Sequence, residues 1–309
     1  MCHNSDMRGF ALPLVLGIIT ILTIVIISIS DSVIHKVGIV IELDSRVRAE
    51  TMTYSAFNEV IFNLMTATFT ATGMKIHQVE GQDMTSDSKN MVTSEWWNLY
   101  GDPIVMHNGA TVILRDAAGM VSPLAGTKIF QQLLDQIVND RDRIAGFIDL
   151  LEDWMDADDF TRLNGGEAWN YRQEGYKYGP RNSFLQALDE LRLIKGLSPA
   201  VFEKMRSDLI YWPGGINYLT MSENLLYACL QDKDMVKLLV DLRRAGQLSS
   251  VVFAGITGIL ETEENLTMPT GMIHAEITTQ LHHATDRIEF VVLNTGTSTQ
   301  PFTILEWRR

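Results

Sequence analysis

The hydrophobic pattern of the chain begins with one continuous apolar stretch. Residues 10–30, FALPLVLGIITILTIVIISIS, contain no charged residue and directly follow Arg8 and Gly9. A membrane-spanning helix needs about 20 residues of this kind. The pattern therefore predicts a transmembrane helix over residues 10–30, preceded by a short polar segment over residues 1–9.

Beyond this stretch, apolar residues recur at the spacing of an amphipathic helix up to Gly73. Val33, Val37 and Val40 begin the series, and charged residues such as Asp44 occupy positions between the apolar ones. If the helix is continuous from the apolar stretch, it extends on the order of 90 Å at 1.5 Å per residue. We expect its first part in the membrane and its second part packed on a globular head.

Alternating apolar and polar residues predict strands on both sides of the chain's middle. Residues 103–106 and 110–115 flank Asn108-Gly109, which is the pattern of a β-hairpin that turns at these two residues. Three further strands are predicted near the C-terminus, over 273–277, 288–292 and 302–307.

Residues 127–245, between these groups of strands, have helical periodicity, and Ser198-Pro199 is typical of a helix start. A connecting loop rich in Gly, Tyr and Asn is predicted over 164–182. The order of elements predicts an α+β fold with a long N-terminal helix, an antiparallel sheet and a large inserted helical domain. The expected segments are a leader (1–9), a transmembrane helix (10–30), an amphipathic helix with the first part of the head (31–125), the inserted helical domain (126–250) and the C-terminal strands of the head (251–309).

Composition narrows the possible functions. The formal net charge of −13 provides no overall field that attracts nucleic acid or anionic lipid. The sequence contains no G-x-S-x-G, P-loop or H-E-x-x-H motif. We therefore expect no catalytic site and no enzymatic activity.

The N-terminal pattern distinguishes three kinds of membrane segment. A secretory signal peptide has a shorter apolar region and a small-residue cleavage site, and neither is present here. A plain anchor fits the length. Arg8-Gly9-Phe10, with Pro13 close behind, resembles the leader of type IV pilins and pseudopilins. This resemblance implies cleavage between Gly9 and Phe10 by a prepilin peptidase and methylation of the new N-terminus.

One position departs from that leader pattern. Most pilins have glutamate at the fifth residue after the cleavage site, where this chain has Leu14. An unpaired charge in the hydrocarbon is costly, so a subunit with no neighbour ahead of it can dispense with this glutamate. Leu14 therefore indicates a tip subunit, unless it is simply one more apolar residue of an anchor.

Four phrases in and around the helical region together resemble one family, the type II secretion minor pseudopilin K (general secretion pathway protein K). They are LRDAAGMVSP at 114–123, DLLEDWMDADD at 149–159, ELRLIKG at 190–196, and INYLT at 216–220. Ser122 and Leu219 stand where the family has asparagine. The order and spacing of the four phrases carry the resemblance over nearly the whole chain.

The family resemblance implies a single-pass protein of the cell inner membrane with its head in the periplasm. It also implies a pilin-like fold whose inserted domain is SAM-like or helix-hairpin-helix-like. Such a protein initiates or caps the pseudopilus that exports folded proteins across the outer membrane. Its implied partners are minor pseudopilins of the I and J types, the major pseudopilin and the prepilin peptidase, and no nucleic acid.

An acidic cluster follows the second phrase. Its carboxylates belong to Glu152, Asp153, Asp156, Asp158, Asp159 and Glu167. Hard oxygen ligands of this kind suit Ca²⁺, and the resemblance implies a calcium site in this domain. We expect Asp156, Asp158, Asp159 and Glu167 to supply ligands. The alternative is a solvated acidic face whose side chains satisfy backbone N–H groups.

Residues 191–205, LRLIKGLSPAVFEKM, are similar to a helix-hairpin-helix, which some proteins use to hold a DNA phosphate. They suggest an alternative function, a bitopic periplasmic binding protein of the DNA-uptake type. The hairpin of that motif normally contains G-x-G, but Leu197-Ser198 follow Gly196 here, and few cations lie nearby. A helix-packing module used between proteins fits the residues better.

The leader pattern makes a direct prediction about the mature protein. Cleavage should occur after Gly9, and Phe10 should carry a methylated amino group in the protein purified from its native membrane. Mass spectrometry of the N-terminus measures both. An intact Met1, or a cut near Ser30, would contradict the pilin interpretation, whereas Gly9→Ala should slow cleavage and accumulate a heavier precursor.

Overall fold

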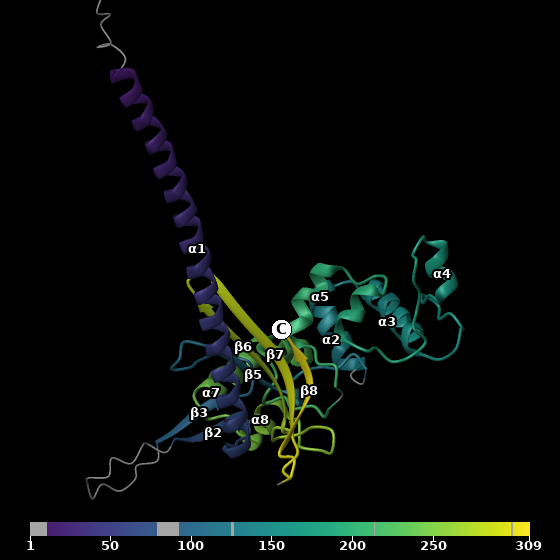
Figure 1. Ribbon diagram of the computed structural model, residues 1–309. Coiled ribbons are helices and arrows are strands. Elements are labelled where there is room, and N and C mark those ends of the chain that lie inside the picture. The colour runs from purple at the N-terminus through teal and green to yellow at the C-terminus, as the bar shows by residue number, and fades with distance from the viewer. Residues whose placement is uncertain (1–10, 79–92, 125–126, 213, 298) are drawn as a thin grey trace, which may run out of the picture.

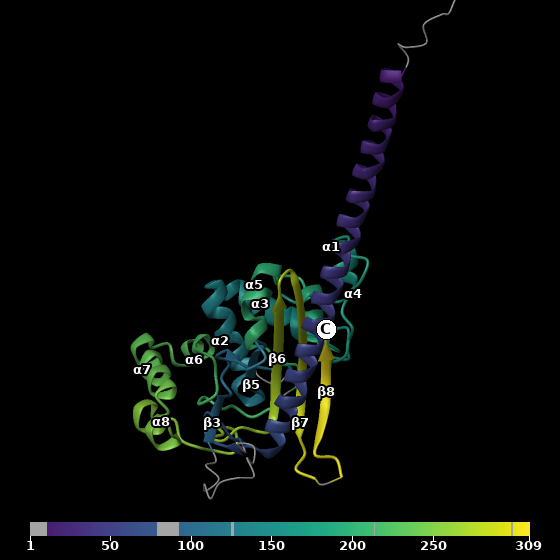
Figure 2. The ribbon, with the colours of Figure 1, turned by 60° about the vertical axis from the view of Figure 1, so that its left-hand side comes forward.

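The computed structural model describes residues 11–78, 93–124, 127–212, 214–297 and 299–309. Helix α1 (Ala11–Thr66) dominates its shape and projects far beyond the head in both views (Figures 1 and 2). Every residue from Leu12 to Asp44 is exposed, so the first part of α1 packs against nothing in this chain. The predicted long helix with a free apolar part is confirmed.

The second part of α1 is amphipathic and packs on the head. Its buried residues recur every three or four positions, at Ala49, Thr53, Ala56, Val60 and Leu64. This spacing places them on one helix face, as a helix that covers a sheet requires. The Thr53 and Thr279 hydroxyls lie 3.0 Å apart in a buried hydrogen bond that joins α1 to the sheet.

The main sheet has five antiparallel strands in the order β4-β5-β6-β7-β8. They are β4 (Ile104–Val105), β5 (Thr111–Asp116), β6 (Met272–Leu281), β7 (Ala284–Asn294) and β8 (Phe302–Arg308). The predicted hairpin at Asn108-Gly109 is confirmed by the pairing of β4 with β5, and the three predicted C-terminal strands are confirmed as β6, β7 and β8. Strands adjacent in this sheet therefore come from both sides of the helical region.

A second sheet was not predicted. It contains β1 (Thr68–Phe69), β2 (Gly73–Gln78) and β3 (Thr93–Asn98), in that order. The expectation that helix continues to Gly73 is wrong, because α1 ends at Thr66 and Gly73 begins a strand. A Cβ atom at Gly73 would lie 2.4 Å from the carbonyl oxygen of Trp97, so glycine permits the close approach of β3.

The helical region lies between β5 and β6 in sequence. Its α-helices are α2 (Thr127–Val138), α3 (Arg141–Met155), α4 (Ala168–Gln173), α5 (Pro199–Met205), α6 (Glu223–Leu230), α7 (Lys233–Arg244) and α8 (Ser250–Thr257). Three short 3₁₀ turns accompany them, η1 (Ala117–Gly119), η2 (Leu188–Leu193) and η3 (Arg206–Asp208). The α+β class with an inserted helical region is thereby confirmed.

Local signals explain several of these helix boundaries. Ser198 caps α5 as predicted, since its hydroxyl accepts a hydrogen bond from the Val201 N–H and Pro199 occupies the first turn. Helix α4 interrupts the loop that was expected over 164–182. Helix α8 begins at the expected end of the insertion, and the next strand starts only at Met272.

Asp116 joins the helical region to the main sheet. It is fully buried at the end of β5 and accepts hydrogen bonds from Asn217 Nδ2 (3.1 Å) and Thr220 Oγ1 (3.0 Å). It also accepts from the backbone N–H (3.0 Å) and the hydroxyl (2.9 Å) of Thr270, just before β6. Burial raises the pKa of Asp116 above its usual range, and the four donors oppose this rise. Two of the family phrases, at 114–123 and 216–220, thus meet at one carboxylate.

The sheet face opposite α1 contacts the helical region through charged residues. Arg206 of η3 lies 3.9 Å from Glu289 of β7, and Asp189 of η2 lies 3.4 Å from Arg308 of β8. The hydrogen bond from His274 and the cations nearby lower the pKa of Glu289 to about 2. A small apolar cluster that includes Ile210 and Val291 adds to these ionic contacts, so the sheet is covered on both faces.

Candidate functional site

The exposed part of α1 is one of two features that can act outside the head. In the described residues, it contains the one helix segment long and apolar enough to cross a membrane. The apolar surface continues past residue 30 through Val37, Val40 and Leu43, all exposed. Leu14 is 61% exposed on this helix, and Gly9 and Phe10 lie outside the described residues. About 15 residues of exposed helix, which carry these apolar side chains, thus remain between the predicted span and the head.

The second feature is the acidic loop, residues 156–167, which follows α3. Two carboxylates of α3 hold this loop against the helix. Asp153 is fully buried and accepts from the backbone N–H groups of Arg162 (3.1 Å) and Gly166 (2.8 Å). Asp149 accepts from both the backbone and the side-chain nitrogen of Asn164, each at 3.0 Å. Asp153 therefore acts as an organising residue, although the sequence suggested only that it belongs to the cluster.

Arg162 is the cation inside the cluster. Its guanidinium contacts Glu152 (2.8 Å), Asp153 (2.7 Å) and Asp156. The hydrogen bonds to Asp156 and Asp153 raise the pKa of Arg162, which stays charged. Sequence reasoning missed this residue because an arginine nine positions after Asp153 has no fixed distance to it until the loop is folded.

Asp158 and Asp159 shape the turn in the loop. Asp158 Oδ1 accepts from the Phe160 N–H at 2.9 Å, and Asp159 Oδ1 accepts from Asn182 Nδ2 at 3.1 Å. Both residues are exposed. These contacts agree with the alternative in which carboxylates satisfy nearby donors, and they leave the second oxygen of each residue facing solvent.

Glu167 differs from its neighbours because it is buried without a partner. The residue is 4% exposed and faces the Asn170 N–H in the capping box of α4, but neither carboxylate oxygen accepts a hydrogen bond of normal geometry. Burial, together with the charges of Asp153 and Asp156, raises the pKa of Glu167 to about 7. Asp156 Oδ1 is also buried without a partner. A buried acceptor without a donor is costly, so these atoms indicate a position where a proton or a cation belongs.

The donor chemistry of the acidic loop fits a calcium ion. Carboxylate oxygens are the ligands that Ca²⁺ prefers, and three unpartnered ones belong to Glu167 and Asp156. Within the described residues, no three His, Cys, Asp or Glu side chains already converge as a metal site. The Arg162 guanidinium lies among the carboxylates instead, so occupation by a metal requires this side chain to move.

The phrase at 190–196 folds against the acidic loop. Glu190 accepts from Trp154 Nε1 (3.2 Å), Arg181 Nε (2.6 Å) and the Gln186 N–H (2.8 Å). Although burial acts in the opposite direction, these hydrogen bonds lower the pKa of Glu190. Lys195 lies over the Tyr171 ring at 4.5 Å. The family phrases around Trp154 and Glu190 are therefore the packed core beneath the acidic loop.

The geometry defines a class of protein, a head of mixed sheet and helix attached to one apolar anchor helix. Residues 114–214 match the model of the family described as type II secretion system (T2SS), protein K. This segment holds three of the four phrases that carry the resemblance. The match confirms the resemblance to protein K of type II secretion over residues 114–214.

Other comparisons add little. No curated protein matches the chain. A chain of the crystal structure of the GspK-GspI-GspJ complex from the enterotoxigenic Escherichia coli type 2 secretion system is 14% identical, with a TM-score of 0.43. The alignment covers 64% of this chain and 79% of that chain. A likeness at this level supports no conclusion about fold or function by itself.

Proposed function

We propose that the chain is a minor pseudopilin that initiates or caps the pseudopilus of a type II secretion system. Its α1 helix anchors it in the inner membrane, and its head lies in the periplasm. The observation that carries the proposal is the protein K match over 114–214 on a head attached to an apolar helix. The chain would act by assembly, with no catalytic step of its own.

The exposed apolar surface of α1 supports assembly with other helices. Residues 33–43 lie between the predicted span and the head, and all of their large apolar side chains are exposed. Apolar surface of this extent is removed from water when helices associate. The proposed occupants are the N-terminal helices of minor pseudopilins of the I and J types and of the major pseudopilin.

Leu14 supports a place at the tip. A glutamate at this position would need a cationic partner within the hydrocarbon, and the chain has an exposed leucine there. The helical region adds bulk to one side of the head (Figures 1 and 2). A subunit of this shape would start the filament, with other subunits added behind it after prepilin peptidase acts at Gly9-Phe10.

We further propose that the acidic loop binds Ca²⁺ through Asp156, Asp158, Asp159 and Glu167. The unpartnered oxygens of Glu167 and Asp156 support this assignment, because a divalent cation would replace the missing donors. The role of the ion would be structural, since it would neutralise carboxylates that otherwise repel one another.

The alternative function, DNA binding through the 191–205 hairpin, is disfavoured by the partners of its cations. Lys195 Nζ lies 2.6 Å from Glu174, and Arg206 lies 3.9 Å from Glu289. Arg192 contacts Glu203 and Asp189. Phosphate binding depends on protein cations that are available to neutralise phosphates, and of these residues and Lys204 only Lys204 makes no ion pair with the described part of the chain.

The first prediction of this proposal concerns pH and calcium. The pKa of Glu167 is about 7 in the folded protein and about 4.5 when unperturbed. The folded state therefore binds more protons in this interval, and with chelator present the free energy of unfolding should fall as pH rises from about 4.5 to 7. Millimolar Ca²⁺ should oppose the fall by binding the ionised carboxylates of the folded state.

Thermal unfolding of the full chain in detergent micelles measures both effects. Glu167→Gln should reduce the pH dependence over this interval and remove most of the calcium shift, whereas the exposed Asp142→Asn should change neither. A calcium shift that persists in Glu167→Gln and in Asp156→Ala would place the ion elsewhere. No shift with millimolar Ca²⁺ after chelation would leave the loop as a solvated acidic face.

The second prediction concerns the position in the filament. Purified pseudopili should contain this protein in far smaller amounts than the major subunit, and Leu14→Glu should not increase secretion. Cysteine at the exposed α1 positions Ile39 or Leu43 should cross-link to helices of other pseudopilins, with the exposed head position Val105 as control. Recovery in amounts like those of the major subunit would contradict the tip assignment.

A further inference from the structure

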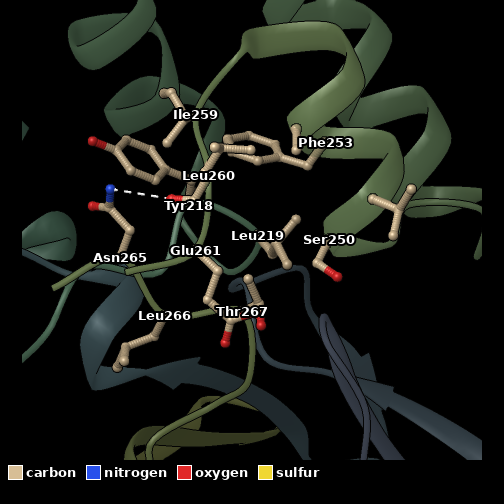
Figure 3. Close-up of a pocket in the computed structure, with 12 residues that line it drawn as sticks. Tyr218, Leu219, Ser250, Phe253, Ile259, Leu260, Glu261, Asn265, Leu266 and Thr267 are labelled. Carbon is tan, nitrogen blue, oxygen red and sulfur yellow. Dashed lines mark hydrogen bonds between the residues drawn. The ribbon is translucent and has the colours of Figure 1, made fainter. Parts of the chain in front are cut away.

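A separate cavity of about 200 Å³ lies between α8 and the segment that returns to the sheet, residues 259–267 (Figure 3). Its apolar walls come from Tyr218, Leu219, Phe253, Ala254, Ile259 and Leu266. The Tyr218 and Phe253 rings stack with their centroids 5.7 Å apart. In both ribbon views, α8 lies at the end of the head away from the projecting part of α1 (Figures 1 and 2).

The return segment is held in place before any ligand binds. The Ile216 N–H donates to the Glu264 carbonyl at 2.9 Å, and the Leu266 N–H donates to the Ile216 carbonyl at 2.7 Å. Thr262 Oγ1 accepts from the Asn265 N–H at 3.0 Å. Because this wall is already ordered, binding against it would cost little conformational entropy.

The rim of the cavity is apolar and acidic. Val251 and Leu260 are 80% and 68% exposed beside it. Residues 245–273 contain no lysine or arginine. Glu261 lines the cavity, whereas Glu263 and Glu264 line a neighbouring pocket together with Lys128, and none of the three glutamates makes an ion pair with the described part of the chain. The rim therefore presents the unpaired carboxylate of Glu261 next to exposed apolar side chains.

We propose that this cavity is a docking site for a protein segment that carries one aromatic or branched aliphatic side chain flanked by lysine or arginine. A volume of about 200 Å³ is below the range typical of small-molecule pockets, about 300–1,000 Å³, and it suits one large side chain as an anchor. The unpaired Glu261 at the rim, with Glu263 and Glu264 close to it in the chain, selects a cationic partner. The site lies outside the segment 114–214 and does not depend on the proposed secretion role.

Fluorescence anisotropy of labelled pentapeptides, titrated with the full chain in neutral detergent micelles, tests this site. The probes are Lys-Ala-Phe-Ala-Lys, Glu-Ala-Phe-Ala-Glu and Lys-Ala-Ala-Ala-Lys. The first should bind roughly tenfold more tightly than either of the others, and its affinity should fall with added salt. A micelle-only titration corrects for partition of the peptide into detergent.

Two kinds of variant separate the anchor from the charge. Ala254→Trp should fill the cavity and weaken binding of the first peptide roughly tenfold, and Leu260→Ser at the exposed rim should do the same with neither a new bulky group nor a new charge. Glu261→Gln with Glu263→Gln and Glu264→Gln should also weaken it and reduce the salt dependence. The matched control is Asp142→Asn with Asp234→Asn and Asp241→Asn, which changes the net charge by the same amount. It should leave the affinity for the first peptide within about twofold of the unmodified chain.

Several results would overturn the proposal. If Ala254→Trp and Leu260→Ser bind the first peptide as tightly as the unmodified chain does, the peptide binds elsewhere. Equal affinity for the glutamate-flanked peptide would show that the glutamates do not select a cationic partner. If the lysine-flanked phenylalanine peptide does not bind, the cavity is not a docking site. Self-association of the full chain that Ala254→Trp abolishes would make a second copy the occupant.

Discussion

The buried carboxylate of Asp116 is the contact on which the arrangement of the head depends. The helical region leaves the sheet directly after β5 and returns directly before β6, two strands that pair with each other. Asp116 bonds to residues of the helical region and to Thr270 at the point of return. Gly119 lies so close to Thr220 that a Cβ atom would be 2.6 Å from its carbonyl oxygen. Donors from two separate segments therefore hold one buried carboxylate.

The junction at Asp116 holds the helical region against one face of the sheet, where Arg206 and Asp189 form ion pairs with residues of β7 and β8. The other face is left for α1. The acidic loop and the cavity beside α8 lie at different places on the helical region. Under the proposed function, each is open to a partner of its own while α1 lies in the membrane.

Local pattern was sufficient to predict the long apolar helix, the hairpin at Asn108-Gly109, the last three strands and the Ser198 cap. Each of these depends on residues within a few positions of one another. The small sheet was missed because the reason for Gly73 is the backbone of Trp97, more than 20 positions away. Of the acidic cluster, the sequence revealed the carboxylates but not the guanidinium of Arg162 among them, nor that both oxygens of Glu167 and one of Asp156 are buried without a donor. Those facts depend on tertiary contacts.

Hydrogen exchange of the full chain in micelles tests most directly whether Asp116 joins the two parts of the head. Asp116→Ala leaves several buried donors unpaired, so it should lower the opening free energy of amides in α5, α6 and β6 together by about 2–4 kcal/mol. The exposed Asp142→Ala should change it by no more than about 0.5 kcal/mol. Unchanged protection in Asp116→Ala, or a loss confined to β5, would contradict the account.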